Sequence, residues 1–376
     1  MTQSDQPKHS GWAAVRREGG LLAGVVTLIA MVAFGDDWLN SMSGRLVPLL
    51  LFAWLFASML WLSFAVVHHA DCLAAKLGEP YGTLILTISV IVIEVVMISA
   101  VMLTGARNPE LGRDMMFAVL MIVLNGLVGV SLLLGGMRHL EQAHNLQGAN
   151  TFLAVLLPLA TLCLILPNFT QSTAVGTYSS VQMIFAILAS VGLYGAFLIA
   201  QTLRHRGYFQ MQEVADDHPQ DHHGLVLRSI GFHVTLLLAN MLPIILLSKS
   251  MAKLIDYEIS ALGAPVALGG VIIAVLVLAP EGLAAVKSAL DDRLQRSINI
   301  CLGSALATIG MTVPAILIIG MATDSKVVLG LGPVNSVLFV TTAVVSVVTL
   351  SGRKTNVIHG VVHLILFLAY LVMLFD

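Results

Sequence analysis

Residues 78–94 read GEPYGTLILTISVIVIE, and the apolar run that ends this stretch carries a single charged residue, Glu94. Residues 263–281 read GAPVALGGVIIAVLVLAPE, and their apolar run likewise ends on a single charged residue, Glu281. A charged side chain at the centre of a bilayer costs about 2.5 kcal/mol or more, so it is rare without a function. Two isolated acids, one in each half of the chain, therefore predict the handling of ions or protons.

The composition indicates a membrane protein that crosses the bilayer many times. Hydrophobic residues make up 57% of the 376 residues and charged residues only 11%, whereas soluble domains carry about 25% charged residues. Apolar runs near 20 residues long, the length that spans about 30 Å of hydrocarbon, recur from end to end. The three cysteines lie far apart, which excludes a disulfide framework. The net charge of -2 excludes a nucleic-acid partner and leaves membrane lipid and inorganic ions as partners.

The apolar windows predict an all-α integral membrane protein with about eleven transmembrane helices. The first window is not followed by a small-residue cleavage pattern, so we interpret it as a retained helix rather than a signal peptide. The eleven predicted spans are 20–35, 46–67, 83–104, 115–136, 151–169, 178–201, 229–248, 264–288, 297–321, 328–350 and 357–375.

Basic residues orient these spans. With the N-terminus in the cytoplasm, 13 of the 19 Lys and Arg residues fall on the cytoplasmic side of the membrane. Positively charged loops favour that side, so we expect a cytoplasmic N-terminus and an external C-terminus in the inner (plasma) membrane. The expected segments are an N-terminal tail with the first helix (1–45), a first five-helix repeat (46–203), a cytoplasmic loop (204–228) and a second five-helix repeat (229–376).

The two halves resemble each other. Each of the two opening stretches begins with Gly-x-Pro, continues as an apolar helix, and reaches its acid 16 or 18 residues after the first glycine. The helices of Glu94 and Glu281 run in opposite directions in the topology above. Inverted repeats with a site at the midplane are typical of secondary transporters that work by alternating access. Pro280, directly before Glu281, predicts a kink whose freed carbonyl either coordinates a cation or is only a structural bend.

Longer stretches resemble a known family. They are HHADCLAAKLGEPYG (68–82), APEGLAAVKSALDDRLQRSINICLGSALATIGMTVP (279–314) and GRKTNVIHGVVHL (352–364). All three are similar to cation/proton exchangers of the calcium/cation antiporter superfamily, in particular to the bacterial ChaA type of sodium–potassium/proton and calcium/proton antiporter. The resemblance covers most of the chain and implies one N-terminal helix followed by two inverted five-helix repeats.

The resemblance also implies which residues bind ions. In this family a Gly-Glu pair precedes the first ion-binding Glu by 15 residues, as Glu79 precedes Glu94, and a Gly-Ser pair follows the second Glu, as Ser304 follows Glu281. One feature departs from the family pattern: apolar residues (90–93) replace the usual polar stretch before Glu94. Because Ca²⁺ prefers 6–8 oxygen ligands, this departure favours Na⁺, K⁺ or a weaker calcium site over a high-affinity calcium cage.

Glu94 and Glu281 are therefore the predicted ion- and proton-binding residues. A buried acid without a cationic partner favours its protonated form, and an exchanger needs a group that holds either a proton or a cation. The alternative is a pair of protonated structural acids. Further oxygens are expected from Ser304, Thr308 and Thr312, which share one helix face at i, i+4 and i+8, and from Asn125 in the matching helix of the first half.

Other polar residues have structural alternatives. Ser89 is a candidate ligand before Glu94 and Thr87 a less favoured one, although hydroxyls in membrane helices often bond their own backbone. Glu79 either caps its helix or lines the inner cation entry. His359 and His363 have the i, i+4 spacing of metal ligands but no evident third ligand. The loop is either a solvated linker or a pH and cation sensor, with acids and histidines at Glu213, Asp216, Asp217, Asp221, His205, His218, His222 and His223.

The predicted function is exchange of cytoplasmic Na⁺, K⁺ or Ca²⁺ for protons by alternating access, with no enzymatic activity and no resident cofactor. Two alternatives stay open at this point. A cation channel would use the same acids as a ring, and a membrane-embedded metalloenzyme would use His359 and His363 with one or both acids.

Overall fold

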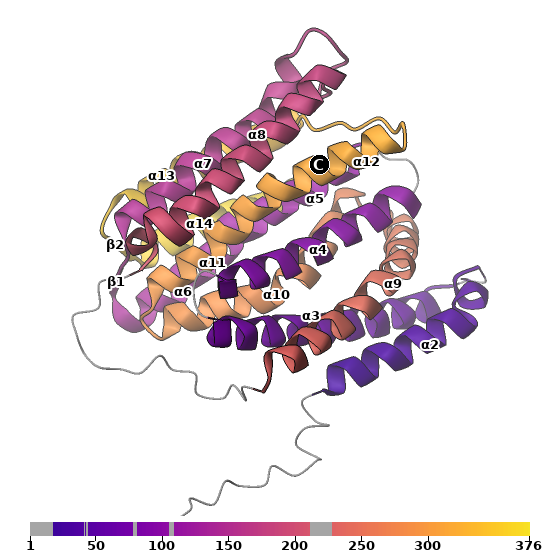
Figure 1. Cartoon of the computed structure of the whole chain (residues 1–376). Helices are drawn as coiled ribbons and strands as arrows, with labels where there is room; N and C mark the ends of the chain where they lie inside the picture. The colour runs from indigo at the N-terminus through magenta and orange to yellow at the C-terminus, as the bar shows by residue number, and fades with distance from the viewer. Residues whose placement is uncertain (1–17, 41, 43, 78–80, 105–108, 211–227) are drawn as a thin grey trace, which may run out of the picture.

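The computed structural model describes residues 18–40, 42, 44–77, 81–104, 109–210 and 228–376, and the predicted Glu79 and most of the 204–228 loop lie outside them. The fold is a bundle of helices with one short pair of strands (Figure 1). The elements of the first half are α2 (Gly19–Asn40), α3 (Leu46–Leu77), α4 (Tyr81–Thr104), α5 (Leu111–Met121), η1 (Ile122–Leu127), α6 (Val128–His139), β1 (Glu141–Ala143), α7 (Leu146–Ala160), η2 (Thr161–Ile165), η3 (Leu166–Phe169), α8 (Ser180–Ile199), η4 (Ala200–Arg204) and η5 (Arg206–Phe209). Those of the second half are α9 (Ile230–Leu262), α10 (Ala267–Leu290), α11 (Leu294–Ala307), η6 (Thr308–Thr312), α12 (Val313–Ala322), α13 (Pro333–Ser351), β2 (Lys354–Asn356) and α14 (Val357–Met373).

These helices confirm the prediction of an all-helical membrane protein. Among the described residues, nine helices are long and apolar enough to cross a membrane, and α4 and α14 each hold a shorter apolar helix, Thr87–Ala100 and Val357–Met373. Their lipid-exposed faces consist of large apolar side chains, such as Val181 and Phe185 on α8. Together they account for the eleven predicted crossings.

The two longest helices extend farthest beyond their predicted ends. We expected spans 46–67 and 229–248, but α3 contains 32 residues and α9 contains 33. At 1.5 Å per residue each helix is about 50 Å long, well beyond the apolar thickness of a bilayer. The predicted ends were wrong because charged and polar residues follow positions 67 and 248, while apolar neighbours such as Leu73 and Ile255 continue to pack and keep the backbone helical.

The packing follows an inverted repeat. The helix that carries Glu94, α4, packs against α11, η6 and α12, and the helix that carries Glu281, α10, packs against α5, η1 and α6. In the same way α8 covers η6 and α12, while α14 covers η1 and α6. The close approach of α14 to α6 requires a glycine, because a Cβ on Gly360 of α14 would lie 2.4 Å from the backbone nitrogen of Leu133 on α6. Each acid-bearing helix thus packs against the third helix of the opposite half.

One side of the molecule, the loop face, is closed by the β1–β2 pair. Glu141–Ala143 pairs with Lys354–Asn356 in antiparallel register. The buried Gln142 donates to Ala289 O at 2.8 Å and to Asp292 Oδ1 at 2.9 Å, which ties β1 to the α10–α11 turn. Residues 207 and 210 also lie on this face, where Asn145 Nδ2 donates to Gly207 O and Gln210 O at 3.3 Å each. Figure 1 shows the β1–β2 pair at this side.

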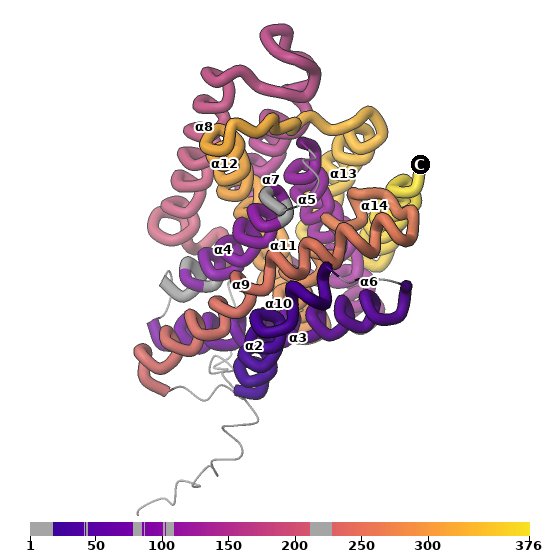
Figure 2. The backbone as a smooth tube through the Cα atoms, turned by 90° about the vertical axis from the view of Figure 1, so that its right-hand side faces the viewer, coloured from indigo at the N-terminus to yellow at the C-terminus, as the bar shows by residue number. Residues whose placement is uncertain are grey.

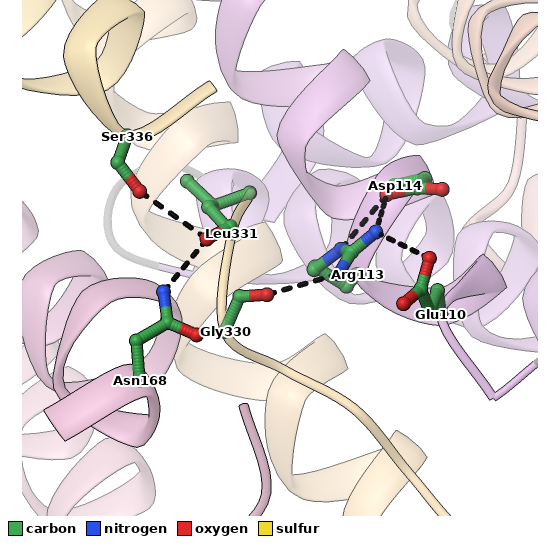
Figure 3. Close-up of polar contacts among 7 residues, drawn as sticks. All are labelled: Glu110, Arg113, Asp114, Asn168, Gly330, Leu331 and Ser336. Carbon is green, nitrogen blue, oxygen red and sulfur yellow. Dashed lines mark hydrogen bonds and ion pairs between the residues drawn. The ribbon is translucent and has the colours of Figure 1, made fainter. Parts of the chain in front are cut away.

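The opposite side, the strap face, is closed by an extended segment that we call the strap (residues 325–332). It crosses this end of the molecule from α12 to α13 (Figure 2). Arg113 on α5 donates to Gly330 O at 2.9 Å and also pairs with Glu110 and Asp114 (Figure 3). Asn168 of η3 donates to Leu331 O at 2.7 Å. The predicted start of a span at residue 328 was wrong because these bonds hold the strap outside α13.

Helices α2, α3 and α9 form a group of their own on one flank of the bundle (Figure 1). Thr27 and Ser58 share a hydrogen bond of 2.9 Å between α2 and α3. The buried rings of His69 on α3 and His233 on α9 meet through their Nδ1 atoms at 3.1 Å. The α3–α9 pair packs against both α4 and α10, so it borders the two helices that carry the acids.

Candidate ion-binding site

Glu94 lies in the buried middle of α4, with only 4% of its surface exposed. Two hydroxyl groups from η6 donate to its carboxylate: Thr308 Oγ1 reaches Oε2 at 2.9 Å, and Thr312 Oγ1 reaches Oε1 at 3.2 Å. Both oxygens of the carboxylate therefore have a neutral donor. No lysine, arginine or histidine in the described part of the chain forms an ion pair with it, so its charge is left for a proton or a cation to balance.

Glu281 lies in α10 and is 8% exposed. Ser304 on α11 donates its hydroxyl to Oε2 of this carboxylate at 2.8 Å. Pro280, the residue before Glu281, is inside the helix and lacks the N–H that would close a backbone bond one turn earlier. The carbonyl of Leu276, one turn before Pro280, thus lacks its usual helical donor.

One helix bridges the two acids. Ser304, Thr308 and Thr312 follow one another along α11 and η6, and the first contacts Glu281 while the other two contact Glu94. The two carboxylates also interact electrostatically with each other. The structure therefore brings together five of the sequence-predicted residues, two acids and three hydroxyls.

A π-helical turn occurs at this point in both halves. The residues of η6, Thr308–Thr312, form one such turn, and Ile122–Leu127 of η1 forms a second in the matching helix. Among the described elements, η2 and η4 are further π-helical turns. π-Helical turns are rare and are often found at functional sites. We did not predict them, because the sequence carries no signal beyond a glycine in each, Gly310 and Gly126. Tyr194 of α8, which sequence reasoning also missed, packs on Gly310 and interacts electrostatically with Glu281.

Asn125 lies elsewhere. Its amide nitrogen donates to Thr342 Oγ1 at 2.8 Å, and its amide oxygen is 3.1 Å from Nδ1 of His363. The other ring nitrogen of His363 meets Thr349 Oγ1 at 3.1 Å. This arrangement joins η1 to α13 and α14 in a buried network, and it uses both ends of the amide. The structure does not bring Asn125 to either acid.

The remaining candidates are also engaged in local bonds. Ser89 is buried and donates its hydroxyl to Ile85 O at 2.7 Å, within its own helix. Thr87 is half-buried on α4. His359 accepts from the backbone N–H of Asn356 at 3.3 Å in a capping box, so it and His363 serve different purposes. Within the described ranges, no group of three or more His, Cys, Asp or Glu side chains could hold a metal ion.

A narrow cavity adjoins Glu94 on the side toward the strap face. Apart from the acid, its walls are apolar side chains and one glycine from α4, α5 and α10. Apart from Glu94, the side chains that line this cavity offer no oxygen ligand for a cation. The lining residues are Glu94, Ile98, Met115, Val119, Gly270, Ile273, Ala274 and Val277.

Comparison with known proteins identifies the family of this chain. Residues 47–203 and 232–375 match the family described as sodium/calcium exchanger protein. The chain is 44% identical over 311 residues to the putative ionic transporter y4hA of Sinorhizobium fredii (strain NBRC 101917 / NGR234). The matched region covers 82% of this chain and 84% of that protein. It is 37% identical over 363 residues to the sodium-potassium/proton antiporter ChaA of Escherichia coli (strain K12), with 96% of each chain covered. The solved structure of the selenium-substituted Ca²⁺/H⁺ antiporter protein YfkE matches the fold with a TM-score of 0.70 at 15% identity, covering 96% of this chain and 98% of that one.

Proposed function

This chain belongs to the sodium/calcium exchanger protein family, and we propose that Glu94 and Glu281 are the two halves of one site at which it exchanges cations for protons. Membership confirms the resemblance noted in the sequence, and it removes the metalloenzyme alternative because this is a family of transporters. Cation/proton exchange agrees with the name of the ChaA relative, which spans almost the whole chain.

The observation that carries the proposal is the set of contacts around the two acids. Both carboxylates are buried and interact with each other, and their hydrogen-bond donors among the described residues are neutral hydroxyls. Two negative charges close together at this depth are unfavourable, so the pair holds either protons or a cation. Because protons and a cation do not occupy the pair together, transport of the cation in one direction is coupled to transport of protons in the other.

The exchange cycle follows from that choice. A cation that reaches the protonated pair from one face displaces its protons: each carboxyl O–H bond breaks, the proton passes to water on that face, and the oxygens coordinate the cation. The loaded site is then exposed to the opposite face, where two protons reverse the process. Because α11 and η6 contact both acids, movement of this helix relative to α4 or α10 changes both halves of the site together.

The ligands favour a monovalent cation or a weakly held calcium ion. The acids and the Ser304, Thr308 and Thr312 hydroxyls supply the oxygens, and the cavity beside Glu94 adds only apolar walls. A high-affinity calcium site needs 6–8 oxygens at the same time. We therefore infer transport of Na⁺ and K⁺, with Ca²⁺ bound less tightly.

We also infer that the loop face is cytoplasmic. The charge count places the N-terminus and the 204–228 segment inside and the strap outside. In this orientation the protein exports cytoplasmic cations against proton entry across the inner (plasma) membrane.

The test uses Glu94→Gln and Glu281→Gln in everted membrane vesicles, with dissipation of a pH gradient by Na⁺, K⁺ or Ca²⁺ as the readout. Glutamine keeps the shape of the side chain but cannot release a proton, so each variant should lose exchange while its amount in the membrane is unchanged. Glu141→Gln is the matched control, since Glu141 is exposed on the loop face and pairs only with Lys354. Full exchange by either buried variant would overturn the assignment.

A further inference from the structure

An aspartate recurs at one position in both halves of the chain. Residues 71–80 read DCLAAKLGEP and residues 256–265 read DYEISALGAP, so each aspartate precedes the glycine of its Gly-x-Pro by seven residues. Asp71 lies six residues before the end of α3, and Asp256 lies six residues before the end of α9. The inverted repeat therefore extends to a second pair of acids, outside the Glu94–Glu281 pair.

The topology sends the two aspartates to opposite sides of the site. Helix α3 ends at the loop face and α9 ends at the strap face, because His69 near the end of α3 meets His233 near the start of α9 at 3.1 Å, so the two helices are antiparallel. Helix α3 packs against both α4, which carries Glu94, and α10, which carries Glu281, and of these two helices α9 packs mainly against α4. Asp71 thus lies between Glu281 and the loop face, and Asp256 lies on the strap-face side of Glu94.

Neither aspartate has a fixed partner. Both are half-buried, and within the described part of the chain neither carboxylate makes a hydrogen bond or a close ion pair. Asp71 does interact electrostatically with Glu281 and with Arg296 of α11. A half-buried carboxylate without a bonded partner is unfavourable. Such a group remains free to bind a cation that passes.

We propose that Asp71 and Asp256 are access residues for the exchange reaction, each binding the cation transiently on one side of the central site. Asp71 serves entry and exit at the loop face, where it interacts electrostatically with Glu281, and Asp256 does the same at the strap face. A carboxylate in a narrow entrance raises the local cation concentration. At the loop face, Arg296 balances the charge of Asp71 while no cation is present. This inference rests on the proposed central site.

The test measures the KM for Na⁺ separately at each face, in everted and in right-side-out vesicles. Asp71→Asn should raise the KM for Na⁺ at the loop face about tenfold, because a charged cleft raises the local cation concentration by about tenfold or more. The KM at the strap face should stay unchanged. Asp256→Asn should do the reverse, and Asp71→Glu should restore the loop-face KM. The matched controls are Asp291→Asn on the loop face and Asp36→Asn near the strap face, both exposed.

Equal changes at both faces, or no change at either, would overturn the proposal, because a merely structural aspartate has no sidedness. If Asp71→Asn fails to insert, Arg296→Gln gives an independent measurement. Without the Arg296 guanidinium, which competes with Na⁺ for Asp71, the loop-face KM for Na⁺ should fall. An unchanged KM would contradict the access role. The two proposals can fail separately. If the central site is wrong, Glu94→Gln still exchanges cations for protons. If only the access role is wrong, Glu94→Gln is inactive.

Discussion

Thr308 donates its hydroxyl to Glu94 across the boundary between the two halves of the molecule, at 2.9 Å. One turn earlier on the same helix, Ser304 donates to Glu281. The third helix of the second half therefore contacts both acids. Within the described contacts, the matching helix of the first half donates no hydrogen bond to either acid, since the side chain of Asn125 is bonded to Thr342 and His363. The two halves match in the order of their helices, but the hydroxyls that donate to the acids all come from the second half.

The first prediction concerns Thr308→Val, which keeps the shape of the side chain and removes the hydroxyl. A hydrogen bond to a charged group contributes about 1.5–3 kcal/mol, so the KM for the transported cation should rise about tenfold or more. The measurement is the cation dependence of pH-gradient dissipation in vesicles. Thr341→Val is the matched control, since Thr341 is exposed and bonds only its own helix. An unchanged KM in Thr308→Val would show that the Thr308 hydroxyl contributes neither through its hydrogen bond to Glu94 nor by binding the cation.

The second prediction concerns the buried network of Asn125 and His363. Removing either side chain leaves a buried polar group without its partner, so Asn125→Ala and His363→Ala should each lower the free energy of unfolding by about 1–3 kcal/mol. Because the two residues share one network, the double variant should lose less than the sum of the single losses. Thermal unfolding in detergent measures this, with the exposed Ser351→Ala as control. A raised cation KM with unchanged stability in Asn125→Ala would instead indicate an ion ligand.

Much of this arrangement could be predicted from the sequence. Isolated charges in apolar runs are visible without a structure, and so is the i, i+4, i+8 spacing of Ser304, Thr308 and Thr312, which the structure places on one side of their helix. The antiparallel course of the Glu94 and Glu281 helices followed from counting spans. These features depend on local periodicity and on the hydrophobic thickness of a bilayer, both of which are encoded residue by residue.

Other features depend on tertiary contacts that the sequence does not display. The direction of the Asn125 amide is set by Thr342 and His363, more than 200 residues away. The π-helical turns shift the register of a helix without a residue type that marks them. The extra turns of α3 and α9 are held by packing between the two helices, which outweighs their charged residues. The strap is extended because Arg113 and Asn168 hold its carbonyl groups.

The third prediction concerns Arg113, whose side chain is only 10% exposed and binds Glu110, Asp114 and the strap. Removing one partner of a buried charge pair costs about 3–5 kcal/mol, so Arg113→Gln should lower the thermal unfolding midpoint markedly. Arg113→Lys should recover only part of the loss, because an ammonium group lacks the fork that reaches three acceptors. The control is Lys326→Gln, an exposed cation in the strap. Equal midpoints for Arg113→Gln and the control would contradict a clamping role.

The last prediction concerns pH and His144, which lies between β1 and α7 on the loop face. The ring is buried, its Nε2 is 3.5 Å from Leu350 O, and its Nδ1 has no partner among the described residues. Burial lowers the pKa of this imidazole, and nearby His359 lowers the pKa further, while the Leu350 carbonyl opposes the shift. The native state therefore binds fewer protons than the unfolded chain in the range below the unfolded pKa of about 6.5.

Stability rises with pH wherever the unfolded state binds more protons. The contribution of His144 is thus fully present above about pH 6.5 and is lost as the pH falls toward the lowered native pKa. The thermal unfolding midpoint in detergent should fall between about pH 7.5 and pH 5.5, and His144→Gln should show a smaller fall because glutamine does not titrate. His205→Gln is the control, a half-buried histidine on the same face that stacks on Tyr208. If His144→Gln and the unmodified chain fell equally, the pH dependence would have to come from other groups.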